Sequence, residues 1–197
     1  YKINTKDRFS VKATSSWMNR HIETNTFGMK AIQLSYFSEA TYLKRFDKND
    51  LVTGINFTGE HFTKKLPDST QIEDYDYSTI GLFVQADWKI TGKLIIQSGL
   101  RFDHHNQYGD FVLPRVSLLY WISHSFPTRH ERGLGYKIPT VFSSEIDEGD
   151  YPLLLPLQNV TAERSGGMNW DVNFHKHLNS WDITINQTFY ITRINHA

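Results

Sequence analysis

The sequence of 197 residues contains no cysteine, carries no formal net charge and has no long apolar run. Without cysteine the chain has no disulfides, no thiolate metal ligands and no cysteine nucleophile. The 21 Lys and Arg residues balance the 21 Asp and Glu residues, so no basic field attracts nucleic acid and we expect no nucleic-acid partner. No stretch approaches the ~18 consecutive apolar residues of a transmembrane helix, which excludes that element.

The N-terminal stretch 1–12 also lacks the apolar core of a signal peptide. The chain begins at Tyr1 rather than at a methionine, and it stops just past a predicted strand. We therefore expect a piece that starts inside a longer, exported protein, in preference to a chain from which a signal was removed.

What the sequence does contain is three consecutive alternating segments between Gly81 and Trp121. Apolar and polar residues alternate through each for about a dozen positions, which is the period of a β-strand with two unlike faces. Ordinary globular strands run ~5–6 residues, whereas a tilted strand that crosses a bilayer needs ~9–11. The pattern therefore predicts a transmembrane β-barrel. The residues predicted to face lipid are Leu82, Val84, Ala86, Trp88, Leu94, Ile96, Val116 and Leu118.

Similar alternation before and after these segments predicts about nine strands, in a single partial β-barrel domain that covers residues 1–197. Two long polar or proline-containing stretches, residues 63–78 and 135–162, are predicted to be extracellular loops. The predicted fold class is all-β, an antiparallel meander of long strands.

The predicted connections separate by length, because the short ones fall at one end of the meander and the longer ones at the other. Outer-membrane barrels have this asymmetry, with short periplasmic turns and longer extracellular loops. Trp88, Tyr120, Phe174 and Trp181 lie on the apolar parity near the short-turn end, as a periplasmic aromatic girdle requires. The alternative is a soluble β-sandwich or barrel that serves as a binding or adhesion module, in which these rings are ordinary core.

Catalytic and metal-binding patterns are weak, so we predict no enzyme, no cofactor and no metal site. Neither a Ser-His-Asp arrangement nor a GxSxG motif is present. His104 and His105 are adjacent on a predicted strand end, where neighbouring side chains point to opposite faces and do not chelate one ion.

Aromatic and histidine side chains in the predicted extracellular loops are the candidates for ligand contact. Their rings can stack on a ligand, although tyrosine also anchors loops by ordinary packing. The candidates are Tyr75, Tyr77, His104, His105, Tyr108, Tyr136, Phe142 and Tyr151.

Residues 81–120, GLFVQADWKITGKLIIQSGLRFDHHNQYGDFVLPRVSLLY, resemble the barrel of TonB-dependent outer-membrane receptors. The later segment GLGYKIPTVFSSE is similar to the Gly-aromatic-basic-x-Pro segment of that family. A third resemblance lies in the segment LPLQNVTAERSGGMNWDVNF, which is similar to the stretch through which chains of that family re-enter the barrel. The glutamate and the glycine of that stretch are matched here by Glu163 and Gly167. The resemblance covers residues 30–193 well and the first strand poorly.

The resemblance implies a Gram-negative receptor with a 22-stranded barrel that imports a bulky scarce nutrient, such as a ferric siderophore, across the bacterial outer membrane. It implies three partners: outer-membrane lipid, a metal-chelate or other small-molecule ligand, and TonB, which is contacted through an N-terminal part that this sequence lacks. The plug and the final strand with its terminal aromatic are absent as well. The resemblance therefore implies a fragment, the C-terminal part of the barrel domain, whose open edges demand pairing.

Overall fold

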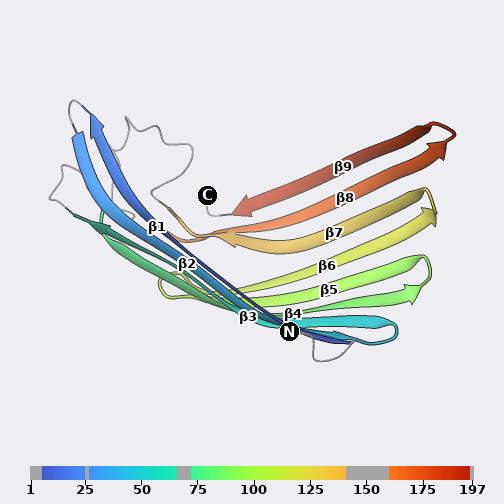
Figure 1. The fold of residues 1–197 in the computed structure, drawn as a ribbon, viewed down its shortest axis with the longest axis horizontal. Helices are drawn as coiled ribbons and strands as arrows, with labels where there is room; N and C mark the ends of the chain where they lie inside the picture. Colours follow the sequence, from blue (N-terminus) through green and yellow to red (C-terminus); the bar gives the residue numbers. More distant parts are fainter. Residues whose placement is uncertain (1–5, 25–26, 66–71, 141–159, 196–197) are drawn as a thin grey trace.

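The computed structural model describes residues 6–24, 27–65, 72–140 and 160–195, and these form one antiparallel sheet of nine strands in sequence order. Each strand pairs with the next along the chain, so the sheet is a simple meander (Figure 1). The strands are β1 (Asp7–Thr24), β2 (Phe27–Arg45), β3 (Asn49–Lys64), β4 (Tyr75–Thr91), β5 (Leu94–His105), β6 (Gly109–Ser123), β7 (Phe126–Lys137), β8 (Glu163–Leu178) and β9 (Trp181–Asn195).

The strands are 12 to 19 residues long, well above the length of ordinary globular strands. Among the described residues, no helix is long and apolar enough to cross a membrane. The all-β antiparallel meander predicted from the alternation is confirmed, and the sheet is open, as a partial barrel.

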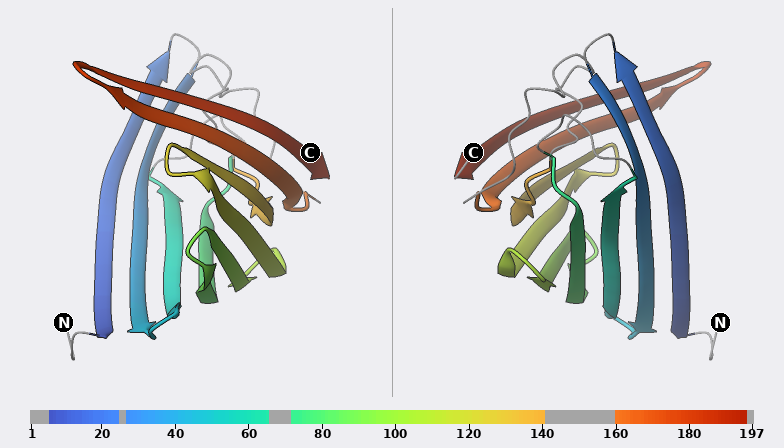
Figure 2. Two further views of the ribbon diagram at one scale, coloured as in Figure 1. Left: turned by 90° about the vertical axis from the view of Figure 1, so that its right-hand side faces the viewer. Right: turned by 90° about the vertical axis from the view of Figure 1, so that its left-hand side faces the viewer.

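The sheet curls as it passes from β1 to β9, so that the last two strands cross the direction of the first three (Figure 2). The two edge strands, β1 and β9, face each other across the open side of this trough (Figure 1). A twisted sheet curls toward closure in this way, and the curl gives the sheet a concave and a convex face.

The tight turns after β2, β4, β6 and β8 lie together at one end of the sheet (Figure 1). In the last of these turns, Asn179 adopts a positive φ of 48°, which asparagine tolerates better than most residues. At the opposite end, Gly109 follows the turn between β5 and β6 and has a φ of 79°, a conformation that favours glycine.

The predicted loop boundaries are wrong at both long connections. The predicted loop 63–78 includes residues of β3 up to Lys64 and of β4 from Tyr75 onward, and the predicted loop 135–162 includes the end of β7 up to Lys137. Strand pairing is a backbone interaction, so it continues through polar residues such as Glu60 and Tyr77, which are direct partners. Loss of apolar alternation was therefore a poor signal for the end of a strand.

These extensions change the setting of the ligand-contact candidates. Tyr75 and Tyr77 lie in β4 and Tyr136 in β7, whereas the sequence pattern predicted them in loops. His104 and His105 are the last residues of β5, in agreement with the predicted strand end. Tyr108 does lie in the turn between β5 and β6, as predicted. Two candidates, Phe142 and Tyr151, lie outside the described residues, together with most of the predicted loop 135–162.

Candidate functional site

The position of residues 138–140, which follow β7, shows which face of the sheet is concave. Ile138, Pro139 and Thr140 line one pocket together with residues of β3, β4 and β5. Because β7 is four strands away from β3 in the curled sheet, a segment that leaves β7 and reaches β3 spans the inside of the curve. The side chains that it meets, among them Glu60 and Tyr77, therefore lie on the concave face.

The other face is apolar and exposed. The register places Trp88, Ile96 and Leu118 side by side on β4, β5 and β6, and a second row contains Ala86 and Val116. Leu82, Val84 and Trp88 are each more than 40% exposed, as are Val116 and Leu118. All eight residues that the sequence predicted to face lipid lie on this convex face, and exposure of apolar side chains there is what a lipid-facing wall requires. Their contact with lipid remains a prediction.

A buried polar network occupies the middle of the concave face. The Arg101 Nε donates to Asp103 Oδ2 at 2.9 Å, and the Arg101 Nη2 donates to Asn56 Oδ1 at 3.1 Å. Gly81 lies between Asn56 and Asp103 in the register, and its missing side chain leaves the space that these polar groups fill. Asp103 is only 2% exposed, so its pairing with Arg101 offsets the cost of burying its charge.

Tyr136 connects this network to the end of β7. Its hydroxyl donates a hydrogen bond of 2.9 Å to Asp103 Oδ2, and its ring stacks on Phe111 with the centroids 3.8 Å apart. The segment 138–140 leaves the sheet immediately afterwards. Tyr136 therefore anchors the start of the connection between β7 and β8 to the wall of the trough.

An aromatic cluster forms nearer the end opposite the tight turns. The rings of Tyr75 and Tyr77 stack with centroids 4.6 Å apart, and Phe62 stacks on the outer side of this pair at 5.2 Å from Tyr75. Tyr77 also meets His105 at 5.4 Å and Tyr108 at 6.0 Å. Four of the predicted ligand-contact residues are thus brought together, from two strands and one turn.

The remaining described candidates lie apart from this cluster. Tyr136 belongs to the Asp103 network, and His104 pairs with Asp110, its Nδ1 lying 2.7 Å from Asp110 Oδ1. The neighbouring His105 is buried and instead accepts hydrogen bonds at Nδ1 from the backbone N–H groups of Gln107 and Tyr108. The two adjacent histidines therefore have different surroundings. Within the described ranges, no group of three or more His, Asp or Glu side chains is arranged to hold a metal ion.

The aromatic cluster lies near the end of β4 that is far from the tight turns. At a rise of ~3.3 Å per residue and a tilt of ~45°, Tyr77 lies about 33 Å above Thr91 along the barrel axis, whereas the apolar band of such a barrel is only ~25 Å tall. Burial raises the pKa of Tyr75, and the hydrogen bond to Glu60 raises it further. Burial also raises the pKa of Tyr77, aided by its hydrogen bond to Tyr108. Both phenols therefore stay neutral at ordinary pH.

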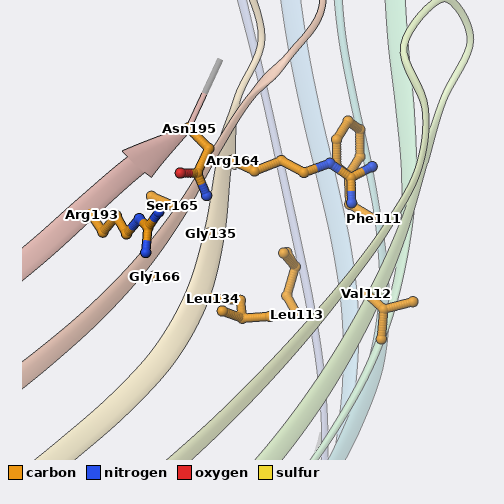
Figure 3. Close-up of a pocket in the computed structure, with 10 residues that line it drawn as sticks. All are labelled: Phe111, Val112, Leu113, Leu134, Gly135, Arg164, Ser165, Gly166, Arg193 and Asn195. Atoms are coloured by element: carbon orange, nitrogen blue, oxygen red, sulfur yellow. The ribbon is translucent and has the colours of Figure 1, made fainter. Parts of the chain in front are cut away.

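A second pocket, of about 270 Å³, opens between β6 and the ends of β7, β8 and β9 (Figure 3). Arg164 extends toward Phe111, and its guanidinium carbon lies 5.2 Å from the ring centroid, a cation–π contact. Arg193 lies beside Ser165 and Gly166 on the opposite wall (Figure 3). The described lining holds these two arginines and no carboxylate, so the pocket carries positive charge.

Sequence reasoning missed several residues of these sites, namely Asn56, Glu60, Phe62, Arg101, Asp103, Phe111, Arg164 and Arg193. For two of these residues the sequence did contain a signal that they lie close together. Arg101 and Asp103 share the polar parity of one strand, which predicts that they lie on the same face. The partners on other strands carried no such signal, because contact between them depends on the register.

Comparison with known proteins agrees with this architecture. A family model described as "TonB dependent receptor-like, beta-barrel" matches residues 2–144. The sequence has no significant match among curated proteins.

Solved structures share the fold at low sequence identity. The siderophore receptor PirA from Pseudomonas aeruginosa has a TM-score of 0.68 and 14% identity, over 94% of this chain and 39% of PirA. The FrpB iron transporter from Neisseria meningitidis has a TM-score of 0.77 and 10% identity, over 100% of this chain and 36% of FrpB. The ferric yersiniabactin uptake receptor FyuA from Yersinia pestis has a TM-score of 0.64 and 17% identity, over 97% of this chain and 34% of FyuA.

The chain thus spans well under half the length of these relatives, while the family model covers most of the chain. The open meander, with an apolar convex face and a polar concave face, is the wall of such a barrel. The chain belongs to the TonB-dependent receptor family and forms part of its β-barrel.

Proposed function

We propose that this chain is part of the barrel wall of a bacterial outer-membrane receptor that imports a bulky, scarce nutrient such as a ferric siderophore or another metal chelate. Its partners are then outer-membrane lipid on the convex face, the nutrient on the concave face, and TonB, which supplies energy to the complete receptor. The proposal assigns transport to the protein and no catalysis.

The observation that carries the proposal is the contrast between the two faces of one sheet. The convex face exposes apolar residues in continuous rows, and the concave face holds the Arg101–Asp103 network and the aromatic cluster. A soluble sandwich buries the apolar face of its sheet against a second layer. The described residues form a single layer, which favours a wall between lipid and an aqueous lumen.

The names of the structural relatives support a metal chelate as the imported nutrient. PirA is a siderophore receptor, FrpB is an iron transporter and FyuA takes up ferric yersiniabactin, as their names state. A copper transporter, OprC, also shares the fold with a TM-score of 0.70, so metal uptake rather than iron uptake alone is the class that they share.

Growth of a deletion strain tests the function. Cells that lack the full-length gene are grown under iron or copper limitation, each with a panel of purified ferric siderophores or copper chelates as the metal source. We expect growth to fail with one chelate and to return when the gene is supplied on a plasmid. Normal growth and normal uptake of every labelled chelate would contradict the proposal.

Cell fractionation tests the location and the alternative of a soluble binding module. We expect the full-length protein to stay in the membrane fraction after lysis and to need detergent for extraction. Recovery in the soluble fraction without detergent would favour the soluble module.

A further inference from the structure

A pocket of about 280 Å³ lies under the segment that crosses the concave face, next to the aromatic cluster. Its described lining comes from β3, β4, β5 and the segment after β7. The lining residues are Thr58, Gly59, Glu60, Tyr77, Thr79, His105, Ile138, Pro139 and Thr140.

Glu60 is the one charged side chain in this described lining. The Tyr75 hydroxyl donates a hydrogen bond to its Oε1, which orients the carboxylate and leaves acceptor positions on both oxygens. The cationic Arg20 donates a 2.7 Å hydrogen bond to Gln33, its charge acts on Tyr75, and it stands outside the described lining of the pocket. The formal charge within the described lining is therefore negative, in contrast to that of the arginine-lined pocket of Figure 3.

His105 does not offset this charge. Its Nδ1 accepts hydrogen bonds from two backbone N–H groups at 3.1 and 3.2 Å, so the single ring proton of the neutral form is on Nε2. Burial lowers the pKa of His105, and the neighbouring His104 lowers it further. The ring is therefore neutral at physiological pH and adds a polar aromatic edge to the pocket.

The stacked tyrosines supply the second element of recognition. Tyr75 and Tyr77 lie 4.6 Å apart, and the contacts with Phe62, His105 and Tyr108 hold the pair in place. The negative face of an aromatic ring attracts a cation, and a neighbouring carboxylate adds to that attraction. An anionic chelate core is repelled by the same carboxylate.

We propose that this pocket is a subsite for a cationic ammonium group, held between the carboxylate of Glu60 and the ring of Tyr77. The proposal rests on the proposed function, since it describes a positively charged part of the molecule that the receptor captures. It predicts that the natural ligand carries an amine or a quaternary ammonium group in addition to any metal-binding part.

Choline is a suitable probe, and 3,3-dimethylbutan-1-ol is its neutral counterpart of nearly equal shape. Binding of each to the purified full-length receptor in detergent is measured by calorimetry and by saturation-transfer NMR. We expect choline to bind about tenfold more tightly than the neutral alcohol, because the cation–π and carboxylate attractions require the charge.

Three variants assign the binding to this pocket. We expect Glu60→Gln and Tyr77→Leu each to weaken choline binding about tenfold, and Tyr77→Phe to keep it, because phenylalanine retains the ring face. Glu39→Gln is the matched control, since Glu39 is a carboxylate on β2 that lines a different concave pocket. A thermal unfolding midpoint equal to that of the parent receptor shows that each variant is folded.

Equal binding of choline and the neutral alcohol would overturn the subsite, and so would choline binding that Glu60→Gln leaves unchanged. Saturable binding of a neutral oligosaccharide that is insensitive to Glu60→Gln would show a carbohydrate site instead. Uptake of labelled chelates by cells is measured in parallel. If the receptor takes up a chelate but shows no preference for choline over the neutral alcohol, only the subsite is overturned. Normal uptake of every chelate in the deletion strain overturns the proposed transport function instead.

Discussion

Tyr136 and Asp103 are joined by a 2.9 Å hydrogen bond between strands that are not neighbours, since β7 and β5 are separated by β6. The bond ties the end of β7 to the buried carboxylate at the centre of the concave face. Because Arg101 holds the same carboxylate from its own strand, the three groups form one unit. Substitutions in these three residues therefore test how much their hydrogen bonds stabilise the concave face of the sheet.

The Tyr136→Phe substitution is expected to lower the free energy of unfolding of the full-length receptor by about 1–3 kcal/mol, the usual cost of removing a hydrogen bond to a buried charged group. The phenylalanine ring keeps the stacking on Phe111. The measurement is the urea unfolding curve in detergent. Tyr120→Phe is the control, because Tyr120 is 45% exposed on the interior strand β6, and an equal effect of both substitutions would contradict a special role for the hydroxyl of Tyr136.

The Gly81→Ala substitution is expected to destabilise the receptor by about 1–3 kcal/mol through overpacking. A Cβ atom at this position would collide with Asn56 Oδ1 and Asp103 Oδ1, and it would lie 2.7 Å from Arg101 Nη2. The shift of the urea midpoint measures the effect. Gly28→Ala serves as the control, because a Cβ there meets nothing within 4 Å, and the same shift at both positions would exclude the proposed collision.

Two arginine substitutions on adjacent residues test which face meets lipid. We expect Ala86→Arg to destabilise the full-length receptor by ~2–4 kcal/mol if it lies near the bilayer midplane, and Gln85→Arg to be tolerated in the polar lumen. The two residues point to opposite faces of β4. Unfolding curves in lipid bilayers provide the measurement, and equal tolerance at both positions would reverse or void the assignment of the faces.

The stability of the receptor is expected to fall as the pH drops below about 6.5, in part because of His105. Burial holds the pKa of His105 below its ordinary value of 6.5, so below that value the unfolded chain binds more protons than the folded one. The stabilisation is therefore present above pH ~6.5 and is lost as the pH falls toward the folded pKa. His105 packs on Tyr77 at the end of the sheet opposite the tight turns.

Unfolding midpoints at pH 7.5 and 5.0 check this expectation. The His105→Gln variant should show a smaller loss between the two values than the parent receptor. His124→Gln, at an exposed turn residue, should behave as the parent does. An identical loss in the parent and in the His105 variant would assign the acid sensitivity to other groups.

The alternation of residue types by itself determined the strands and their two faces. Leu82, Val84 and Trp88 share a face because side chains alternate along any extended chain, whatever it pairs with. Arg101 and Asp103 fall on the opposite face for the same reason. Gly92 and Asn179 in two of the tight turns also carry a local signal, because glycine and asparagine favour the backbone conformations that turns need.

The tertiary structure alone decided which residues form the sites. Arg101 reaches Asn56 across 45 positions of sequence, and Tyr136 reaches Asp103 across 33. These contacts depend on strand register and on the curl of the sheet, since a shift of one residue moves every side chain to the other face. Strand ends were also decided by the tertiary structure, because β3 and β4 continue to pair through polar residues to Phe62 and Tyr75. Backbone hydrogen bonds hold those ends, and the identity of the side chains does not reveal them.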